Sequence, residues 1–247
     1  MKYVFITDIH GNLESLTTFT RSILPDICAD RIICLGDIAG YNADPSACID
    51  IMINKLGAQT IRGNHDRATG HNDFIGFSEH AALSGQWYHD HLEQHDLDLL
   101  AALPRGPLIV DGLLAIAHGA ATDEDKYILY PYHSVKEFEW MERNDVDILF
   151  FGHTHIAGIF CQCGEKVNII RKNKVKLKKG NRYCINPGSL GQPRDKNPNA
   201  AYAFFDTDTM TVELRRFAYP VEIAQIKILE KDVPYGDYLA SRLSSGV

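Results

Sequence analysis

Side chains that can bind a metal ion follow five short apolar segments of this 247-residue sequence. They occur in the segments Asp8-Ile9-His10, Gly36-Asp37, Gly63-Asn64-His65-Asp66, His118-Gly119 and Gly152-His153-Thr154-His155. One such segment alone would more often be a capped turn or a satisfied polar group than a set of ligands. Five of them in one chain are better explained by a single metal site that they share.

The types of side chain restrict the metal and its chemistry. Asp and His with an Asn carbonyl, and without Cys, suit divalent ions such as Mn²⁺, Fe²⁺ or Zn²⁺ and argue against a closed structural zinc site. This number of ligands is too large for one ion, but two ions sharing a carboxylate would keep positions open for water. Two such cations activate water and neutralise phosphoryl oxygens, so the pattern predicts a two-metal hydrolase.

His153 and His155 are separated by one residue. Adjacent side chains of an extended chain point to opposite sides, whereas alternate side chains point to the same side. We therefore expect both imidazoles to face one crevice and to bind one ion each.

The elements that must position these groups alternate between strand and helix over the first sixty residues. Strands are expected at 3–7, 32–35 and 59–62, and helices at 13–24 and 45–56, which begin after Asn12 and at Asp44-Pro45. This repeated pattern predicts parallel strands. Ligands of open α/β sheets bind beyond the carboxyl ends of the strands, which is where the metal-binding groups occur.

The remainder of the chain is expected to be richer in antiparallel strands. Two helices are expected within 78–103, a hairpin around Asp111-Gly112, a helix at 135–143 and a strand at 148–151. Further strands are expected at 159–163, 167–170, 175–177, 182–185, 201–205 and 211–217. No linker separates the two halves, so we expect one α/β domain over residues 1–247.

Composition narrows the class of protein. Hydrophobic residues make up 45% and charged residues 23%, as in ordinary globular proteins, and the net charge of −7 argues against a general nucleic-acid or membrane-surface binder. The N-terminal segment lacks the apolar core of a signal peptide, so a cytoplasmic protein without a membrane span is expected. The six cysteines lack paired CxxC spacing and are expected to be free thiols.

The same residues resemble the calcineurin-like metallophosphoesterase superfamily over about residues 1 to 195. The motifs are DIHGN at 8–12, GDIAGYN at 36–42, GNHD at 63–66, HG at 118–119 and GHTH at 152–155. The stretch NPGSLGQPRD at 186–195 is similar to the compact bacterial and archaeal phosphodiesterase branch. The resemblance implies an α/β sandwich of two sheets flanked by helices, with a binuclear site above it.

The resemblance also implies roles for individual residues. One metal would be held by Asp8, His10 and His155, and the second by Asn64, His118 and His153, with Asp37 bridging the two. His65 would be the proton donor or transition-state stabiliser, Asp66 would orient its ring, and Arg194 would contact the substrate phosphate. The cofactors would be two divalent ions, with Mn²⁺ favoured over Fe, Zn, Ni or Co.

Three functions remain open. The first is hydrolysis of phosphodiesters, or of phosphomonoesters, in a phosphate-ester or nucleotide substrate. The second uses the same site on dinucleoside polyphosphates or nucleic-acid ends. The third is a non-catalytic scaffold, which the complete set of ligands disfavours.

Two further segments have alternative interpretations. Tyr127, Tyr130 and Tyr132 could stack on a base or simply pack, and His71 and His133 are minor candidates for substrate contact. The basic run at 171–182 could attract a polyanion, but lysines that protect an edge strand are the simpler interpretation.

Overall fold

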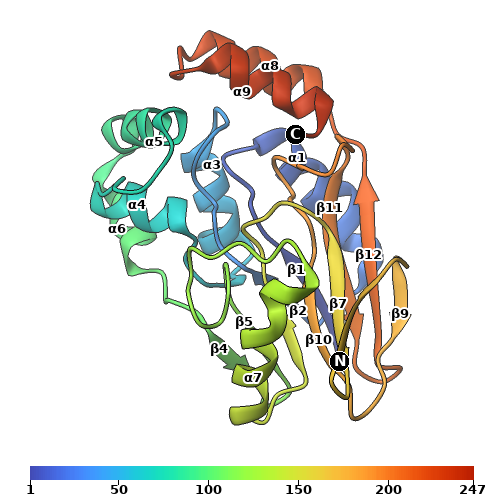
Figure 1. Ribbon diagram of the computed structural model, residues 1–247. Helices are drawn as coiled ribbons and strands as arrows, with labels where there is room; N and C mark the ends of the chain where they lie inside the picture. The colour runs from blue at the N-terminus through green and yellow to red at the C-terminus, as the bar shows by residue number, and fades with distance from the viewer.

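The computed structural model describes the whole chain, Met1–Val247, and contains two six-stranded sheets (Figure 1). The first sheet consists of β1 (Lys2–Ile6), β2 (Arg31–Cys34), β3 (Gln59–Thr60), β9 (Lys174–Lys176), β11 (Ala200–Asp206) and β12 (Thr211–Phe217). The second consists of β4 (Leu108–Val110), β5 (Leu114–Ile116), β6 (Ile148–Phe150), β7 (Gly158–Cys163), β8 (Lys166–Ile170) and β10 (Arg182–Asn186). Their orders are β3-β2-β1-β11-β12-β9 and β4-β5-β6-β10-β7-β8.

The predicted strand pairing is confirmed in part. β1, β2 and β3 are parallel, and β4 and β5 form the hairpin around Asp111-Gly112. The remainder of the chain is richer in antiparallel pairs, as predicted, but it also contains parallel ones. β11 returns to pair with β1, and β6 is parallel to both β5 and β10. The buried strand β1 has backbone N–H and C=O groups along both of its edges, and all of them need hydrogen-bond partners. β2 pairs with one edge and β11 with the other.

Helices flank the sheets. They are α1 (Leu13–Thr18), α2 (Leu24–Ile27), α3 (Pro45–Ile49), α4 (Asn64–His71), α5 (Glu79–His91), α6 (Gln94–Ala102), α7 (Val135–Arg143), α8 (Val221–Glu230) and α9 (Gly236–Ser245). The helices expected at 13–24 and 45–56 each include a wider π-type stretch, at Phe19–Ile23 and Asp50–Lys55. Asn12 caps α1 as predicted, whereas the Asp44 carboxylate pairs with Lys227 and Lys231 of the C-terminal part.

The hydrophobic residues form three layers that match this order of sheets and helices. Tyr3 and Phe5 point into the core between the sheets, where the rings of Phe5 and Phe150 stack 3.6 Å apart. Val4 and Ile6, on the opposite face of β1, pack under the helices. The alternation of side chains along a strand thus allows β1 to contribute to two cores at once. The predicted α/β sandwich of two sheets flanked by helices is confirmed.

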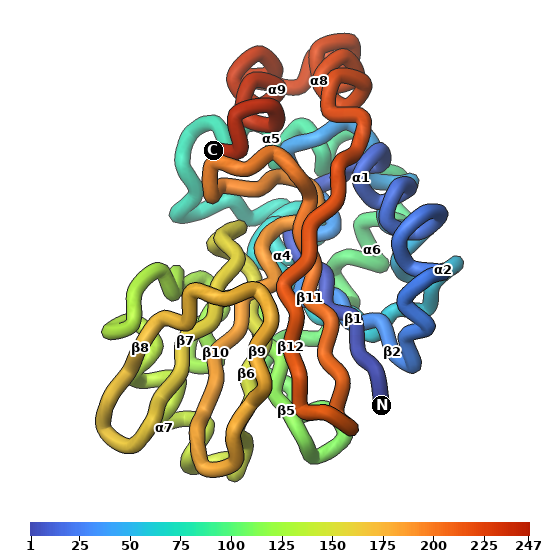
Figure 2. The backbone as a smooth tube through the Cα atoms, turned by 90° about the vertical axis from the view of Figure 1, so that its right-hand side faces the viewer, coloured from blue at the N-terminus to red at the C-terminus, as the bar shows by residue number.

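Two C-terminal helices were not anticipated from the sequence. Figures 1 and 2 show α8 and α9 lying together across one end of the molecule, away from the N-terminus. Ile228, Leu239 and Leu243 are fully buried and join the core that contains α1. None of the helices combines the length and the hydrophobicity needed to cross a bilayer. All six cysteines are free, as predicted.

Candidate metal centre

The structure brings the predicted ligands together in two groups that share Asp37. The first group contains Asp8, His10, Asp37 and His155, and the second contains Asp37, His118 and His153; within each group the ligand atoms lie within 4.8 Å of one another. The Oδ1 atom of Asn64 lies 3.0 Å from Nε2 of His118, which adds Asn64 to the second group. All seven side chains are buried.

The backbone at these positions is strained. Five of the seven residues have positive φ angles, namely Asp8 (53°), His10 (51°), Asp37 (57°), His153 (66°) and His155 (58°). Residues other than glycine rarely adopt this left-handed region, and such strain concentrates at functional sites. Each chain segment turns sharply after its strand, which directs the side chains towards one point.

The imidazoles of His10 and His155 are oriented for a cation between them. Nδ1 of His10 lies 2.9 Å from the carbonyl oxygen of Ala39, and Nδ1 of His155 lies 2.6 Å from that of Gln192. If each Nδ1 donates its proton to that carbonyl, each Nε2 presents a lone pair, and the two Nε2 atoms lie only 3.1 Å apart. Burial lowers the pKa of both rings well below the usual value, so they are neutral. A divalent cation would bind both lone pairs and remove their repulsion.

His118 and His153 complete the second group. Nδ1 of His118 lies 2.8 Å from the carbonyl oxygen of Leu35, and its Nε2 lies 3.3 Å from Oδ2 of Asp37. Burial alone would lower the pKa of His118, but the Asp37 carboxylate raises it to about 10. A site that attracts a proton so strongly also attracts a metal cation. Nε2 of His153 lies 3.0 Å from the carbonyl oxygen of Asp125. Its Nδ1 atom is therefore the one available to bind a metal ion of the second group.

The two buried carboxylates differ in their protonation. Burial raises the pKa of Asp8 to about 7. Burial alone would also raise the pKa of Asp37, but His118, followed by His65 and His10, holds it well below the usual range. Two carboxylates and four imidazoles in a closed space therefore form a donor set that fits divalent cations, and bound cations would favour the ionised form of both carboxylates.

His65 lies beside this centre without belonging to either group. Its ring lies 4.9 Å from that of His10, 4.6 Å from Tyr41 and 5.1 Å from Phe77, measured between ring centroids. Burial lowers its pKa to about 4, so the imidazole is neutral. Its backbone N–H donates to Oδ1 of Asp37 at 2.8 Å, which ties the start of α4 to the shared carboxylate.

Asp66 does not orient the ring of His65. Its carboxylate accepts four backbone N–H groups, from Asp37, Ile38, Ala39 and Gly63, at 2.7 to 3.1 Å. A carboxylate oxygen that is engaged by backbone donors is not available to the imidazole. Asp66 instead fixes the turn that carries Asp37.

The loop at 186–195 holds the Asp8–His10 turn in place. The N–H groups of Leu190 and Gly191 donate to the carbonyl oxygens of Thr7 and Asp8, both at 3.0 Å. Asn12, which caps α1, also donates to the carbonyl oxygen of Gly191 at 2.7 Å. The same loop carries Arg194, whose guanidinium carbon lies 5.5 Å from the centre of the Tyr41 ring.

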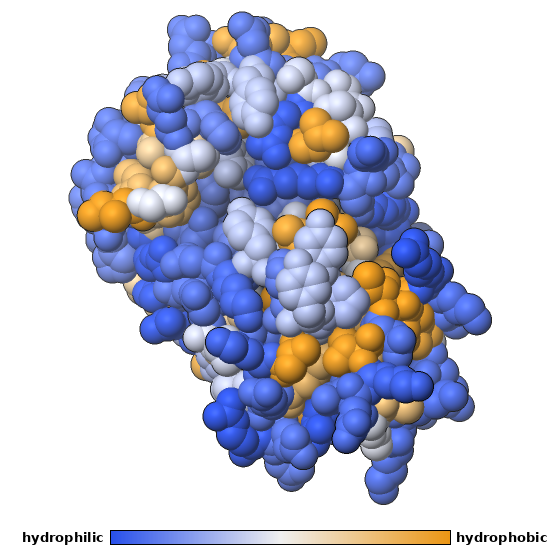
Figure 3. Space-filling view, viewed as in Figure 1, coloured by the Kyte–Doolittle hydropathy of each residue, from blue (hydrophilic) through white to orange (hydrophobic).

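A cleft of about 390 Å³ opens beside the centre. Tyr41, His65, Phe77, Tyr127 and His153 are among its lining residues. The ring of Tyr127 lies 4.1 Å from that of His153, whereas Tyr130 and Tyr132 stack on each other and are exposed. Figure 3 shows a face of the molecule that is mainly hydrophilic, with several hydrophobic groups between the hydrophilic ones. Of the three tyrosines considered for stacking, only Tyr127 lines the cleft.

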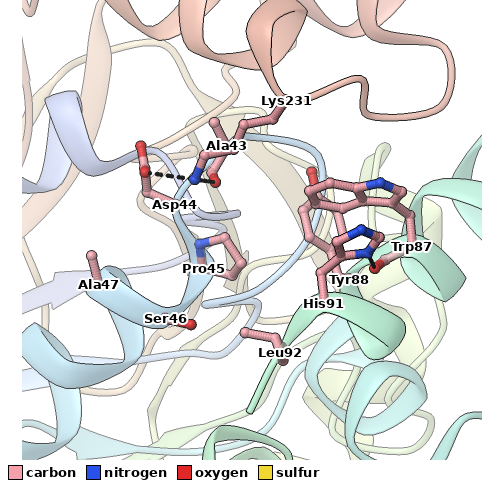
Figure 4. Close-up of a pocket in the computed structure, with 10 residues that line it drawn as sticks. All are labelled: Ala43, Asp44, Pro45, Ser46, Ala47, Trp87, Tyr88, His91, Leu92 and Lys231. Carbon is pink, nitrogen blue, oxygen red and sulfur yellow. Dashed lines mark hydrogen bonds and ion pairs between the residues drawn. The ribbon is translucent and has the colours of Figure 1, made fainter.

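A second cavity, of about 490 Å³, contains none of the predicted ligands. It lies between α3, α5 and the C-terminal helices, where Trp87 and His91 stack 4.1 Å apart below Lys231 (Figure 4). Its walls lack the clustered His and Asp residues that define the candidate centre. His71 and His133 line neither cavity.

One residue near the centre, Tyr41, was not predicted from the sequence. Tyr41 belongs to the GDIAGYN motif, and its φ of 54° directs the chain so that its ring lies between His10 and Arg194. Its position in the motif could have revealed it.

Comparisons with known proteins agree with this architecture. The family model of the calcineurin-like phosphoesterase superfamily domain matches residues 1–210. An uncharacterized protein of Methanocaldococcus jannaschii is 31% identical over 98% of this chain and 96% of its own. The crystal structure of a metallophosphoesterase from Sphaerobacter thermophilus is similar with a TM-score of 0.84 and 29% identity, covering 100% of this chain and 99% of that one.

A hypothetical protein from Pyrococcus horikoshii shares the fold at 17% identity, with a TM-score of 0.78 over 100% of this chain and 98% of its own. The likeness therefore extends through the C-terminal helices, beyond the residues that the family model matches. The chain belongs to the calcineurin-like phosphoesterase superfamily.

Proposed function

We propose that this protein is a binuclear metal-dependent phosphoesterase that hydrolyses phosphodiester bonds, with Mn²⁺ as the preferred ion. The observation that carries the proposal is the sharing of Asp37 by the two groups of ligands. One ion would be held by Asp8, His10 and His155, the other by Asn64, His118 and His153, with Asp37 between them. Two divalent ions would activate water and neutralise phosphoryl oxygens.

The chain's own residues would then bind and orient the substrate. Arg194 would contact a phosphoryl oxygen, because its guanidinium lacks a carboxylate partner and lies against Tyr41. Tyr41, Phe77 and Tyr127 offer aromatic faces to the leaving group. His65 would stabilise or protonate the leaving oxygen, since it is buried beside the ligands and bonded through its backbone to Asp37.

The proposal is tested with metal-stripped protein. Hydrolysis of an aryl phosphodiester, the matching monoester and a dinucleoside tetraphosphate is measured with and without added Mn²⁺. We expect metal-dependent turnover, fastest on the diester. Metal binding without turnover on any of the three substrates would contradict the proposal and favour a scaffold. A faster rate on the tetraphosphate or the monoester would correct the substrate class and leave the metal-dependent chemistry intact.

A further inference from the structure

A short loop between α4 and α5 (Figure 1) exposes an apolar side chain beside the candidate metal centre. The loop covers residues 72–78, and the side chain of Ile75 is 91% exposed, more than any other large hydrophobic side chain of the protein. Single exposed hydrophobic residues are common on protein surfaces and need no explanation. Ile75 differs from them because it lines the same cleft as the candidate ligands Asn64 and His153.

Several contacts hold this loop in one conformation. The N–H of Asp73 donates to the carbonyl oxygen of Ala68 at 3.0 Å, and the N–H of Ile75 donates to Oδ1 of Asp73 at 3.2 Å. The ring of Phe74 packs against α5 at Gly85, where a Cβ atom would overlap with the ring. Ile75 is therefore exposed because the loop presents it to solvent, and not because the loop lacks contacts.

The end of the loop returns to the metal centre. The ring of Phe77 lies 5.1 Å from that of His65 and 5.9 Å from that of Phe74, measured between ring centroids. Gly76 has a φ of 88°, a left-handed conformation that favours glycine, and it separates Phe77 from Ile75. Phe77 thus lies beside the buried His65, while Ile75 lies at the solvent-exposed end of the same cleft.

Two tyrosines add to the apolar lining of the cleft. The ring of Tyr127 lies 4.1 Å from that of His153, and the ring of Tyr41 lies 4.6 Å from that of His65. Flat aromatic side chains offer large apolar faces to planar groups. Pockets for small molecules are typically lined in this way, with a few polar groups that fix the orientation of the ligand.

The charged side chains of the cleft neutralise each other. Arg67 and Asp125 are the only Arg, Lys, Asp or Glu residues that line it. One terminal nitrogen of Arg67 donates to both carboxylate oxygens of Asp125 at 3.1 Å, and Arg67 also pairs with Glu124. A chain of phosphate groups would need unpaired cations, so the cleft is better suited to an uncharged group.

We propose that this cleft is a subsite for an uncharged aromatic group on the alcohol that leaves the phosphate, with Ile75 as a specificity-determining residue. The inference rests on the proposed phosphoesterase function. It narrows the substrates to diesters of aryl alcohols or nucleosides, in preference to alkyl esters and dinucleoside polyphosphates. The occupant follows from the position of the cleft, because an ester bound at the metal centre would extend into the space that His65 and His153 share with Ile75.

Phenylphosphonate and methylphosphonate test the subsite without turnover, because both carry the same charged group and neither has an ester bond. Calorimetry measures their binding to the protein in the presence of Mn²⁺. We expect phenylphosphonate to bind at least about tenfold more tightly, because its ring buries apolar surface in the cleft. Ile75→Ser should reduce this preference at least about threefold, whereas Ile75→Phe should keep at least the preference of the unmodified protein.

Ile226→Ser is the matched control. Ile226 lies in α8, is 53% exposed and does not line the cleft, so the same change there should leave the preference unaltered. Thermal unfolding verifies that the variants fold, which we expect because both side chains are exposed. Equal affinities of the two phosphonates for the unmodified protein, or binding of neither, would overturn the subsite. Equal preferences of the Ile75→Ser and Ile226→Ser variants would overturn it as well.

The two proposals fail separately. If phenylphosphonate is preferred through Ile75 but no ester is hydrolysed with metal, the phosphoesterase function is wrong and the aromatic subsite remains. If the aryl diester is hydrolysed with metal and the two phosphonates bind equally, the subsite is wrong and the phosphoesterase function remains.

Discussion

The individual residues of the metal centre are held in conformations that an isolated chain would avoid. Positive φ angles at five ligands cost on the order of 1 kcal/mol each. Backbone hydrogen bonds offset this cost, above all the four N–H groups that Asp66 accepts. The side chains can therefore face one point before any substrate arrives, which is the preorganisation that electrostatic catalysis needs.

Substitution of His65 can distinguish an effect on catalysis from an effect on metal binding. His65→Ala should lower turnover of the aryl diester about 10²-fold and leave the bound metal unchanged, because the side chain belongs to neither group of ligands. Elemental analysis and steady-state rates measure the two effects. His71→Ala, at the exposed end of the same helix, should retain full activity. Loss of metal without a loss of turnover at saturating Mn²⁺ would exclude this role for His65.

Gly191 shows how closely the backbone segments approach. A Cβ atom at this position would overlap with the carbonyl oxygen of Ile9, whereas a Cβ at Gly158 would meet no atom within 4 Å. We expect Gly191→Ala to destabilise the fold by more than about 3 kcal/mol. Gly158→Ala should remain within about 1 kcal/mol of the unmodified protein. Denaturant unfolding of both variants tests this, and equal stabilities would show that the loop can move away.

At the scale of secondary-structure elements, the site depends on where strands end. β1, β2 and β3 in one sheet and β5 and β6 in the other deliver their ligands from the same end of the sandwich. The loops that follow are tied together by ion pairs. Glu124, between Tyr127 and the strand end of β5, binds Arg62, Arg67 and Arg105. These ion pairs of Glu124 hold the segment that follows it in place. Two groups of that segment contact His153, namely the carbonyl oxygen of Asp125 and the ring of Tyr127.

β9, within the basic segment at 171–182, forms an edge of the first sheet. β9 pairs only with β12, and Lys174 makes an ion pair with Glu213 at 2.6 Å. Replacing Lys172 and Lys174 by Glu should leave nucleotide affinity and its salt dependence unchanged and reduce stability by up to about 1 kcal/mol through loss of that pair. Titrations at two salt concentrations check the expectation. A clear fall in affinity would assign the lysines to a polyanion site.

For the whole molecule, we expect metal ions bound at the centre to stabilise the folded protein. We expect saturating Mn²⁺ to raise the Tm, because ions that bind only the folded state stabilise it by about 2.7 kcal/mol per site at a hundredfold excess over Kd. Asp8→Asn should abolish much of this rise. A thermal scan of stripped and loaded protein measures both effects, and an unchanged Tm in the unmodified protein would argue against metal binding at this centre.

The same substitution has the opposite effect on the metal-free protein. Burial raises the pKa of Asp8 from its usual 3.8 to about 7, so its ionisation disfavours folding increasingly between these pH values and fully above pH 7. Metal-free Asp8→Asn should therefore be more stable than the unmodified protein at pH 8 by about 1 to 3 kcal/mol, and by less at pH 5. If the Asp8→Asn variant gained more stability at pH 5 than at pH 8, ionisation of the buried Asp8 would not be what destabilises the metal-free protein.

The amino-acid sequence was sufficient to predict the parallel βαβ units, the order of the strands along the chain and the residues that could be ligands. These follow from local spacing, because side-chain periodicity and turn residues act over a few positions. The metal-binding side chains that follow five apolar segments were sufficient to predict a shared site. The α/β sandwich followed from the resemblance of these motifs to a known family.

Which strands share a sheet and which groups Asp66 binds could be learned only from the folded structure. β11 pairs with β1 across about two hundred residues of sequence, and no local pattern encodes that choice. The Asp66 carboxylate faces four backbone donors, three from the turn after β2 and one from Gly63 just before α4. Such contacts depend on how distant surfaces bury one another, and they exist only once the chain is folded.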